Sequence, residues 1–367
     1  MDRRRFLVLG TAGSGVMALG SVSLLGRGAA RAQSSAVPVV DRLVMTNAVD
    51  NVYDIFARGG RLDTITVQRT ALGVPPLVAE HGLAYHLESQ RGAERRQILL
   101  DFGLTDTTLF QNYRALQIDP AHADALIVSH GHRDHYGALP ELARRESGKL
   151  KPGLTLYAGG EDTFCHRFVT TAAGRTDQGQ LDRAALEARG LRVVLARQPT
   201  TIAGHAFSTG QIARITDFEK PPATARLMAG PMDSACSATH FGATTVEVKP
   251  GELVADTFQG EHATCYHVKD RGLVVVTSCG HAGVINSVRQ AQKASGVPKV
   301  HAVVGGFHTS GLGEERITRV VEAFRALEVD YVVPQHCTGI EAIGALGQRL
   351  PKETIASSVG SAFVFAA

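Results

Sequence analysis

Short apolar runs alternate with amphipathic segments along most of this chain. In the first half, apolar runs of strand length predict β-strands over 39–44, 64–67, 82–87, 97–102 and 126–129. In the second half, they predict strands over 154–157, 192–195, 273–277, 300–304, 331–334 and 361–365. Helical spacing predicts helices over 106–116, 137–145, 283–295 and 313–327. Strands that alternate with helices favour an α/β fold, with loops and hairpins expected over 196–262.

The first 32 residues have a different pattern. Arg3-Arg4-Arg5-Phe6-Leu7 precedes a Gly-rich, mildly apolar stretch, and Ala30-Arg31-Ala32 fits a small-residue cleavage site. A membrane anchor is the alternative, but four glycines and Arg27 interrupt the apolar stretch. We therefore predict a twin-arginine signal peptide over 1–32 and a domain over 33–367. This implies the twin-arginine export machinery as a partner and a periplasmic or otherwise exported location.

The balance of basic and acidic residues depends on the first 32 residues. The chain has 38 basic and 35 acidic side chains; without residues 1–32 it loses five arginines and one aspartate, which leaves 33 and 34. The basic balance thus belongs to the signal, and no nucleic-acid partner is expected. The five cysteines include no Cys-x-x-Cys pair, so we do not expect a disulfide framework. A single disulfide bridge is compatible with this count.

The segment from His130 to His135 carries the chemistry. It places three imidazoles and one carboxylate, at His130, His132, Asp134 and His135, directly after the apolar run 125–128. Loops at strand ends present reactive groups, and His with Asp is a good ligand set for divalent cations. A solvated polar loop would have no reason to concentrate imidazoles in this way. The segment therefore predicts a site for two metal ions.

Three later histidines share one context. His281, His308 and His336 each follow an apolar run that reads as a buried strand. Any one of them could be a structural imidazole. Their repeated placement at strand ends predicts that they complete the metal site.

The His-x-His-x-Asp-His spacing resembles that of the metallo-β-lactamase superfamily. This resemblance implies an αββα sandwich and two divalent metal ions, with zinc as the first expectation and manganese or iron as alternatives. Further motifs are similar to those of the branch that includes the 7,8-dihydropterin-6-methyl-4-(β-D-ribofuranosyl)aminobenzene-5′-phosphate synthases. They are Glu80-His81-Gly82, Leu100-Asp101-Phe102-Gly103, Ser278-Cys279-Gly280-His281, Gly305-Gly306-Phe307-His308 and His336-Cys337-Thr338-Gly339. The chain departs from the branch at Tyr136-Gly-Ala-Leu139 and after Gly210.

The resemblance also suggests how the ligands divide. One metal is assigned to His130, His132 and His281, and the second to Asp134, His135 and His336. His308 falls where the superfamily usually has a bridging aspartate, so we expect it to bind one metal or to face the substrate as a catalytic group. Asp134 is expected to orient the nucleophile as well as bind metal.

Other residues are candidates for supporting roles. Asp101 is predicted either to orient a ligand imidazole or to form a turn before Gly103. Glu80 and His81 are expected to support the site or to brace the sheet. Cys279 and Cys337, each within two residues of a proposed ligand, are interpreted as buried packing in preference to ligation.

The function predicted first is hydrolysis of a small-molecule ester, amide or phosphoester by a metal-activated water. A transferase reaction like that of the named synthases is the second hypothesis, which export from the cytoplasm disfavours. A non-enzymatic metal-binding protein is the third. A flavin–diiron oxidoreductase is disfavoured because such sites are richer in carboxylates and no flavin domain is predicted.

Overall fold

A computed structural model describes residues 37–70, 76–231, 234–237 and 248–367. The predicted signal peptide over 1–32 lies outside these residues. Among the described helices, none combines the length and apolar character that a bilayer span requires.

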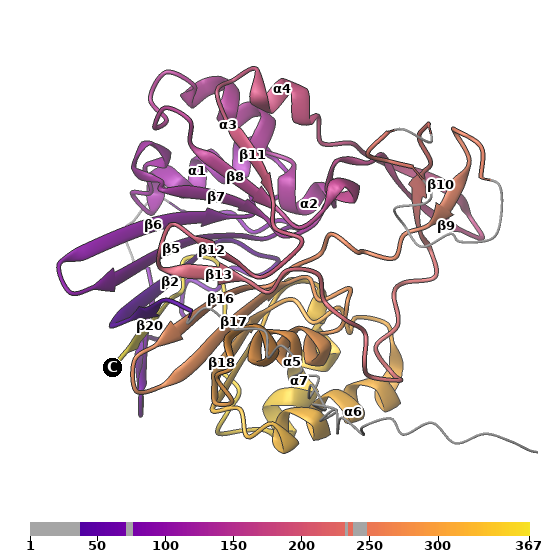
Figure 1. The fold of residues 1–367 in the computed structure, drawn as a ribbon. Helices are drawn as coiled ribbons and strands as arrows, with labels where there is room; N and C mark the ends of the chain where they lie inside the picture. Colours follow the sequence, from indigo (N-terminus) through magenta and orange to yellow (C-terminus); the bar gives the residue numbers. More distant parts are fainter. Residues whose placement is uncertain (1–36, 71–75, 232–233, 238–247) are drawn as a thin grey trace, which may run out of the picture. The chain divides into compact units, whose positions relative to one another are not determined.

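One large sheet is built mainly from the first half of the chain (Figure 1). Its nine described strands run in the order β11-β8-β7-β6-β5-β2-β20-β4-β3, and β6, β7, β8 and β11 are parallel. The strands are β2 (Arg42–Val49), β3 (Gly60–Leu62), β4 (Ile65–Gln68), β5 (Ala84–Arg91), β6 (Glu94–Leu100), β7 (Ala125–Val128), β8 (Thr155–Ala158), β11 (Arg192–Leu195) and β20 (Ala362–Ala366).

A second sheet of seven described strands comes mainly from the second half. Its order is β12-β13-β16-β17-β18-β19, with β1 paired to β16, and β17, β18 and β19 are parallel. The strands are β1 (Val39–Val40), β12 (Thr200–Ile202), β13 (Ala206–Ser208), β16 (Thr264–Val268), β17 (Gly272–Ser278), β18 (Val300–Gly305) and β19 (Tyr331–Pro334).

The two sheets pack face to face between two layers of helices. One buried cluster joins apolar side chains of both sheets, such as Tyr85 and Ile127 of the first and Tyr266 and Val304 of the second. The first sheet's outer face packs on α1 (Asp106–Ala115), α3 (Leu139–Glu146) and α4 (Arg183–Glu187). The second sheet's outer face packs on α5 (Val284–Ser295), α6 (Gly313–Ala326) and α7 (Ile340–Arg349). The predicted αββα sandwich is confirmed.

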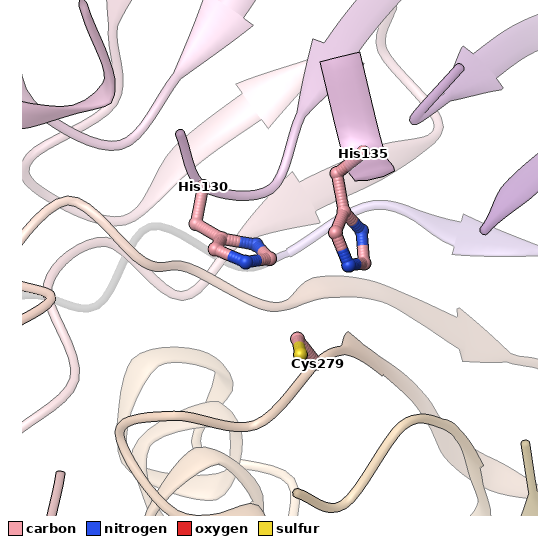
Figure 2. Close-up of side chains that lie close together, drawn as sticks. All are labelled: His130, His135 and Cys279. Atoms are coloured by element: carbon pink, nitrogen blue, oxygen red, sulfur yellow. The ribbon is translucent and has the colours of Figure 1, made fainter. Parts of the chain in front are cut away.

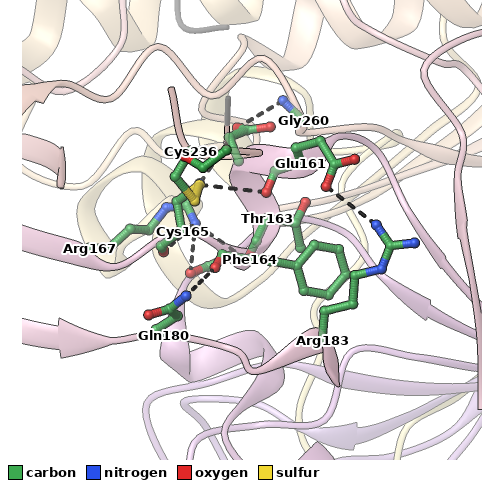
Figure 3. Close-up of a disulfide and its surroundings, with 12 residues drawn as sticks. Glu161, Thr163, Phe164, Cys165, Arg167, Gln180, Arg183, Cys236 and Gly260 are labelled. Carbon is green, nitrogen blue, oxygen red and sulfur yellow. Dashed lines mark hydrogen bonds and ion pairs between the residues drawn. A yellow bond between two sulfur atoms is a disulfide. The ribbon is translucent and has the colours of Figure 1, made fainter. Parts of the chain in front are cut away.

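A third, four-stranded sheet is an addition that the sequence pattern did not predict. It has the order β10-β9-β14-β15, from β9 (Arg167–Thr171), β10 (Gly174–Gly179), β14 (Ala225–Met228) and β15 (Leu253–Ala255). A disulfide joins Cys165 to Cys236 beside it, which is the single bridge for which the cysteine count left room (Figure 3). Over 196–262 the described residues form the expected antiparallel pairs: β12 and β13 extend the second sheet, and β14 and β15 belong to this third sheet.

Candidate metal centre

The candidate ligands lie where parallel strands of both sheets end. His130 and His132 follow β7, and the one-turn helix α2 (Arg133–Tyr136) then presents Asp134 and His135. His281, His308 and His336 follow β17, β18 and β19. The carboxyl ends of parallel strands meet at the same edge of a sheet. Residues more than 200 positions apart in the sequence, such as His135 and His336, therefore come together.

The first cluster holds three imidazoles. The ligand atoms of His130, His132 and His281 all lie within 4.8 Å of one another. Burial holds the pKa of His130 and His281 well below the ordinary value and lowers the pKa of His132 to about 4. These rings are neutral near pH 7, and each keeps a lone pair available to a cation.

The second cluster centres on a carboxylate. Asp134 Oδ2 lies 3.2 Å from His336 Nε2 and 3.7 Å from His135 Nε2, and the two Nε2 atoms are 3.2 Å apart. Burial by itself lowers the pKa of His135, but Asp134 and Asp101 raise it to about 9. The two carboxylates thus favour a positive charge at this position, which a metal ion can supply in place of a proton.

Asp101 orients imidazoles of both clusters. Its Oδ2 accepts from His135 Nδ1 at 2.8 Å and from the Ser129 hydroxyl at 2.7 Å. Because that hydroxyl gives its only proton to Asp101, it can only accept from His130 Nδ1, 3.0 Å away. Both rings are thus held with Nε2 free for a metal. Asp101 also has a left-handed backbone conformation, with φ 58°.

Asn51 orients the ring of His336, and Glu261 holds the backbone of His281. Asn51 Oδ1 lies 3.0 Å from His336 Nδ1, which leaves His336 Nε2 free. Glu261 is buried and accepts the backbone N–H of His281 at 2.9 Å. Sequence reasoning missed both residues. Asn51 lies two residues after the end of β2, so the strand-end rule used for the histidines applies to it as well.

The two residues of the Glu80-His81 motif have separate roles. Glu80 accepts from the backbone N–H groups of Leu104 and Thr105 and from the Thr105 hydroxyl, at 2.6 to 3.0 Å. These contacts brace the turn before α1. His81 lies at the second cluster: its Nε2 is 3.3 Å from Asp134 Oδ2, within ligand distance of Asp134 and His336.

His308 lies beside the first cluster. Its ring centroid is 4.1 Å from that of His281, and its Nδ1 is 3.8 Å from the sulfur of Cys279. On the other side of His281, Phe258 stacks on the ring at 4.0 Å and meets His132 edge-on at 5.2 Å. Phe258 comes from the 196–262 region and carried no sequence signal as a site residue. It packs against two rings of the first cluster.

The nitrogen atoms of these imidazoles fit metal ions by their own chemistry. His130 Nε2 and both ring nitrogens of His281 are buried and have no hydrogen-bond partner among the described atoms. Each unpaired buried polar atom lowers the stability of the fold by about 1–3 kcal/mol. A cation bound to these nitrogens would remove that loss. Nitrogen ligands on one tetrahedral zinc are separated by roughly 3.5 Å, which lies within the spacing of these clusters.

Comparisons with known proteins agree with the geometry. The family model described as the metallo-β-lactamase superfamily matches residues 84–151, from β5 to the end of α3. A 7,8-dihydropterin-6-methyl-4-(β-D-ribofuranosyl)-aminobenzene-5′-phosphate synthase of Methanocaldococcus jannaschii is 27% identical over 297 residues, which cover 77% of this chain and 90% of that protein. An uncharacterized protein of the same organism is 24% identical, over 74% of this chain and 88% of that protein.

A solved structure supports the fold. The crystal structure of a metal-dependent hydrolase of the β-lactamase superfamily aligns with a TM-score of 0.62 at 21% identity, covering 87% of this chain and 98% of that chain. The superfamily implies divalent metal binding, commonly of zinc. The sandwich fold of this chain is that of metallo-β-lactamase superfamily proteins, and the superfamily's model matches the segment that carries His130, His132, Asp134 and His135.

Proposed function

We propose that this protein is a metal-dependent hydrolase that cleaves an ester, amide or phosphoester bond of a small-molecule substrate. The observation that carries the proposal is the set of unpaired, buried imidazole nitrogens of His130 and His281, directly beside the Asp134 cluster. A buried group of neutral imidazoles with one carboxylate suits divalent cations and has no evident structural purpose.

The proposed centre holds two divalent ions. His130, His132 and His281 would hold one, and Asp134, His135 and His336 the other, with zinc as the preferred metal. When bound, such ions lower the pKa of water towards neutrality and stabilise the negative charge of the transition state.

The chain's own residues prepare this site. Asp101 and Asn51 fix the ring orientations of His135 and His336 before any metal arrives. In this proposal Asp134 Oδ2 also accepts a hydrogen bond from the nucleophilic water and orients it. His308, partly exposed beside His281, is positioned to donate a hydrogen bond to the substrate or its leaving group.

A transferase is the second candidate, and the relative named as a synthase favours it. That protein aligns over 90% of its own length. The same clusters could then bind the phosphate groups of a substrate during group transfer. The predicted export of this chain argues for hydrolysis, because we propose that the protein acts outside the cytoplasm.

The test compares turnover with and without metal. The purified protein is analysed for metal content, stripped with a chelator and assayed on ester, lactam and phosphodiester panels and for consumption of a dihydropterin diphosphate. We expect hydrolysis that disappears on stripping and returns with zinc. The variant His281→Ala should lose it, whereas His267→Gln, on β16 and outside every metal-binding group, should keep it.

Each other outcome has a clear meaning. Turnover that is unchanged without metal would overturn the proposal. Bound metal without hydrolysis would support the non-enzymatic alternative, and consumption of the pterin diphosphate alone would support the transferase.

A further inference from the structure

Cys279 lies between the two metal clusters. It follows the last residue of β17, and its side chain points towards His130 of the first cluster and His135 of the second (Figure 2). The three ligand atoms lie within 4.8 Å of one another. The sulfur of Cys279 belongs to two further groups of this kind, one with His281 and His308 and the other with His336 and Cys337. It is therefore close to ligands of both proposed metals.

The balance of charge at this centre favours a further anionic ligand. Two divalent ions carry four positive charges, whereas Asp134 is the one carboxylate among the six assigned ligands and the other five are imidazoles. Uncompensated charge in a buried site is costly. The neighbouring buried carboxylates are committed elsewhere, since Asp101 accepts from Ser129 and His135, and Glu261 accepts from the backbone of His281.

The two thiols of the centre are not equivalent. Cys337 has a carbonyl acceptor, the backbone oxygen of Cys279, at 3.2 Å. The Cys279 sulfur has no carbonyl acceptor among its described contacts, which are the Cys337 sulfur at 3.0 Å and His308 Nδ1 at 3.8 Å. The third free cysteine, Cys265, is an example of ordinary packing. It is buried on β16 among Val275, Val303 and other apolar side chains, and it belongs to none of the possible metal-binding groups of the described residues.

We propose that Cys279 would bind metal as a thiolate, close to the ligands of both proposed ions. This rests on the metal centre of the proposed function. On binding, the thiol proton would leave to solvent and the sulfur would donate a lone pair to the metal. Thiolate sulfur is a soft ligand, so the centre should select zinc, or iron, over manganese and magnesium. The packing interpretation of Cys279 is then replaced by ligation.

Cobalt substitution tests this directly. A thiolate ligand gives cobalt(II) an intense near-ultraviolet charge-transfer absorption that imidazole and carboxylate ligands do not give. We expect the band in the full-length wild-type protein loaded with cobalt, and we expect at least a fivefold loss of it in Cys279→Ala and Cys279→Ser. Cys265→Ala is the matched control and should keep the full band, as should Cys337→Ala. Circular dichroism checks that each variant is folded.

A wild-type measurement makes the test independent of folding. X-ray absorption at the zinc edge should find sulfur at roughly 2.3 Å from zinc. If the protein binds two metal ions but shows neither the band nor the sulfur distance, the thiolate proposal fails and the metal centre stands. If the band depends on Cys337 and not on Cys279, the assignment is wrong. If no metal binds at all, the proposed function fails and this inference fails with it.

Discussion

Asp101 Oδ2 lies 2.8 Å from His135 Nδ1, and neither side chain is exposed to solvent. The same carboxylate reaches His130 through the Ser129 hydroxyl. One acid from β6's end thus sets the ring orientation of a ligand in each cluster. The coupling means that a change at Asp101 should affect both metals together.

Asp101→Asn should weaken metal binding by roughly 10–100-fold. The amide that replaces the carboxylate cannot accept all the hydrogen bonds from Ser129 and His135, so the imidazole orientations are no longer fixed. Affinity is measured by competition with a metal-binding dye. Asp124→Asn is the matched control, because Asp124 accepts from the Gln97 backbone at the opposite end of β7. Equal affinities for the two variants would contradict the role given to Asp101.

Metal should stabilise the fold, and His281 should be needed for much of the effect. At a free zinc concentration of 100 times Kd, binding adds about 2.7 kcal/mol to the free energy of unfolding. We therefore expect chelation to lower the Tm of the wild-type protein. His281→Ala should bind one ion fewer and show a much smaller difference in Tm with and without zinc, while His267→Gln should behave like wild type. A zinc-dependent rise in Tm that survives in His281→Ala would count against the first cluster.

Arg167 supports the metal loop from the third sheet. Its guanidinium is buried, donates to Asp256 at 2.8 Å, lies 3.5 Å from Asp162 and donates to the backbone oxygen of Gly131 at 3.2 Å. Arg167→Met leaves two buried carboxylates without their cation, which should cost about 3–5 kcal/mol. Denaturant unfolding measures this cost.

Two further variants separate the buried ion pair from general effects. Arg175→Met, on β10 beside Phe168, removes an exposed guanidinium and should change stability by no more than about 0.5 kcal/mol. The double variant Arg167→Met with Asp256→Asn should recover part of the loss, because it removes a charge left without its partner. No recovery would show that Arg167 acts by packing alone.

Export should depend on the arginine pair near the start of the chain. In a host with a twin-arginine pathway, Arg3→Lys with Arg4→Lys should leave the protein unprocessed in the cytoplasm. Arg27→Lys keeps the pair and should not affect export. Cell fractionation and the N-terminal sequence of the product give the result, and export that continues without the pair would refute the signal.

The sequence by itself determined the strands that carry the ligands and the fold class. Apolar runs mark β7, β17, β18 and β19 because buried parallel strands are apolar on both faces. The ligands from His130 to His135 lie on one loop and one helical turn. Their relative positions are therefore set by a short local segment of the sequence. His281 and His336 could be selected because the same strand-end context recurs.

Only the tertiary structure decided which side chains meet across the two sheets. Cys279 and Phe258 lie at the metal clusters because the sandwich brings the ends of two separate sheets together. No local sequence pattern encodes that packing. The direction of a side chain after a strand also depends on backbone conformations such as φ 51° at Ser278 and φ 47° at His308 and His336. Apolar periodicity gives the face of a strand but not the path of the loop that follows it, and the centre is built from those loops.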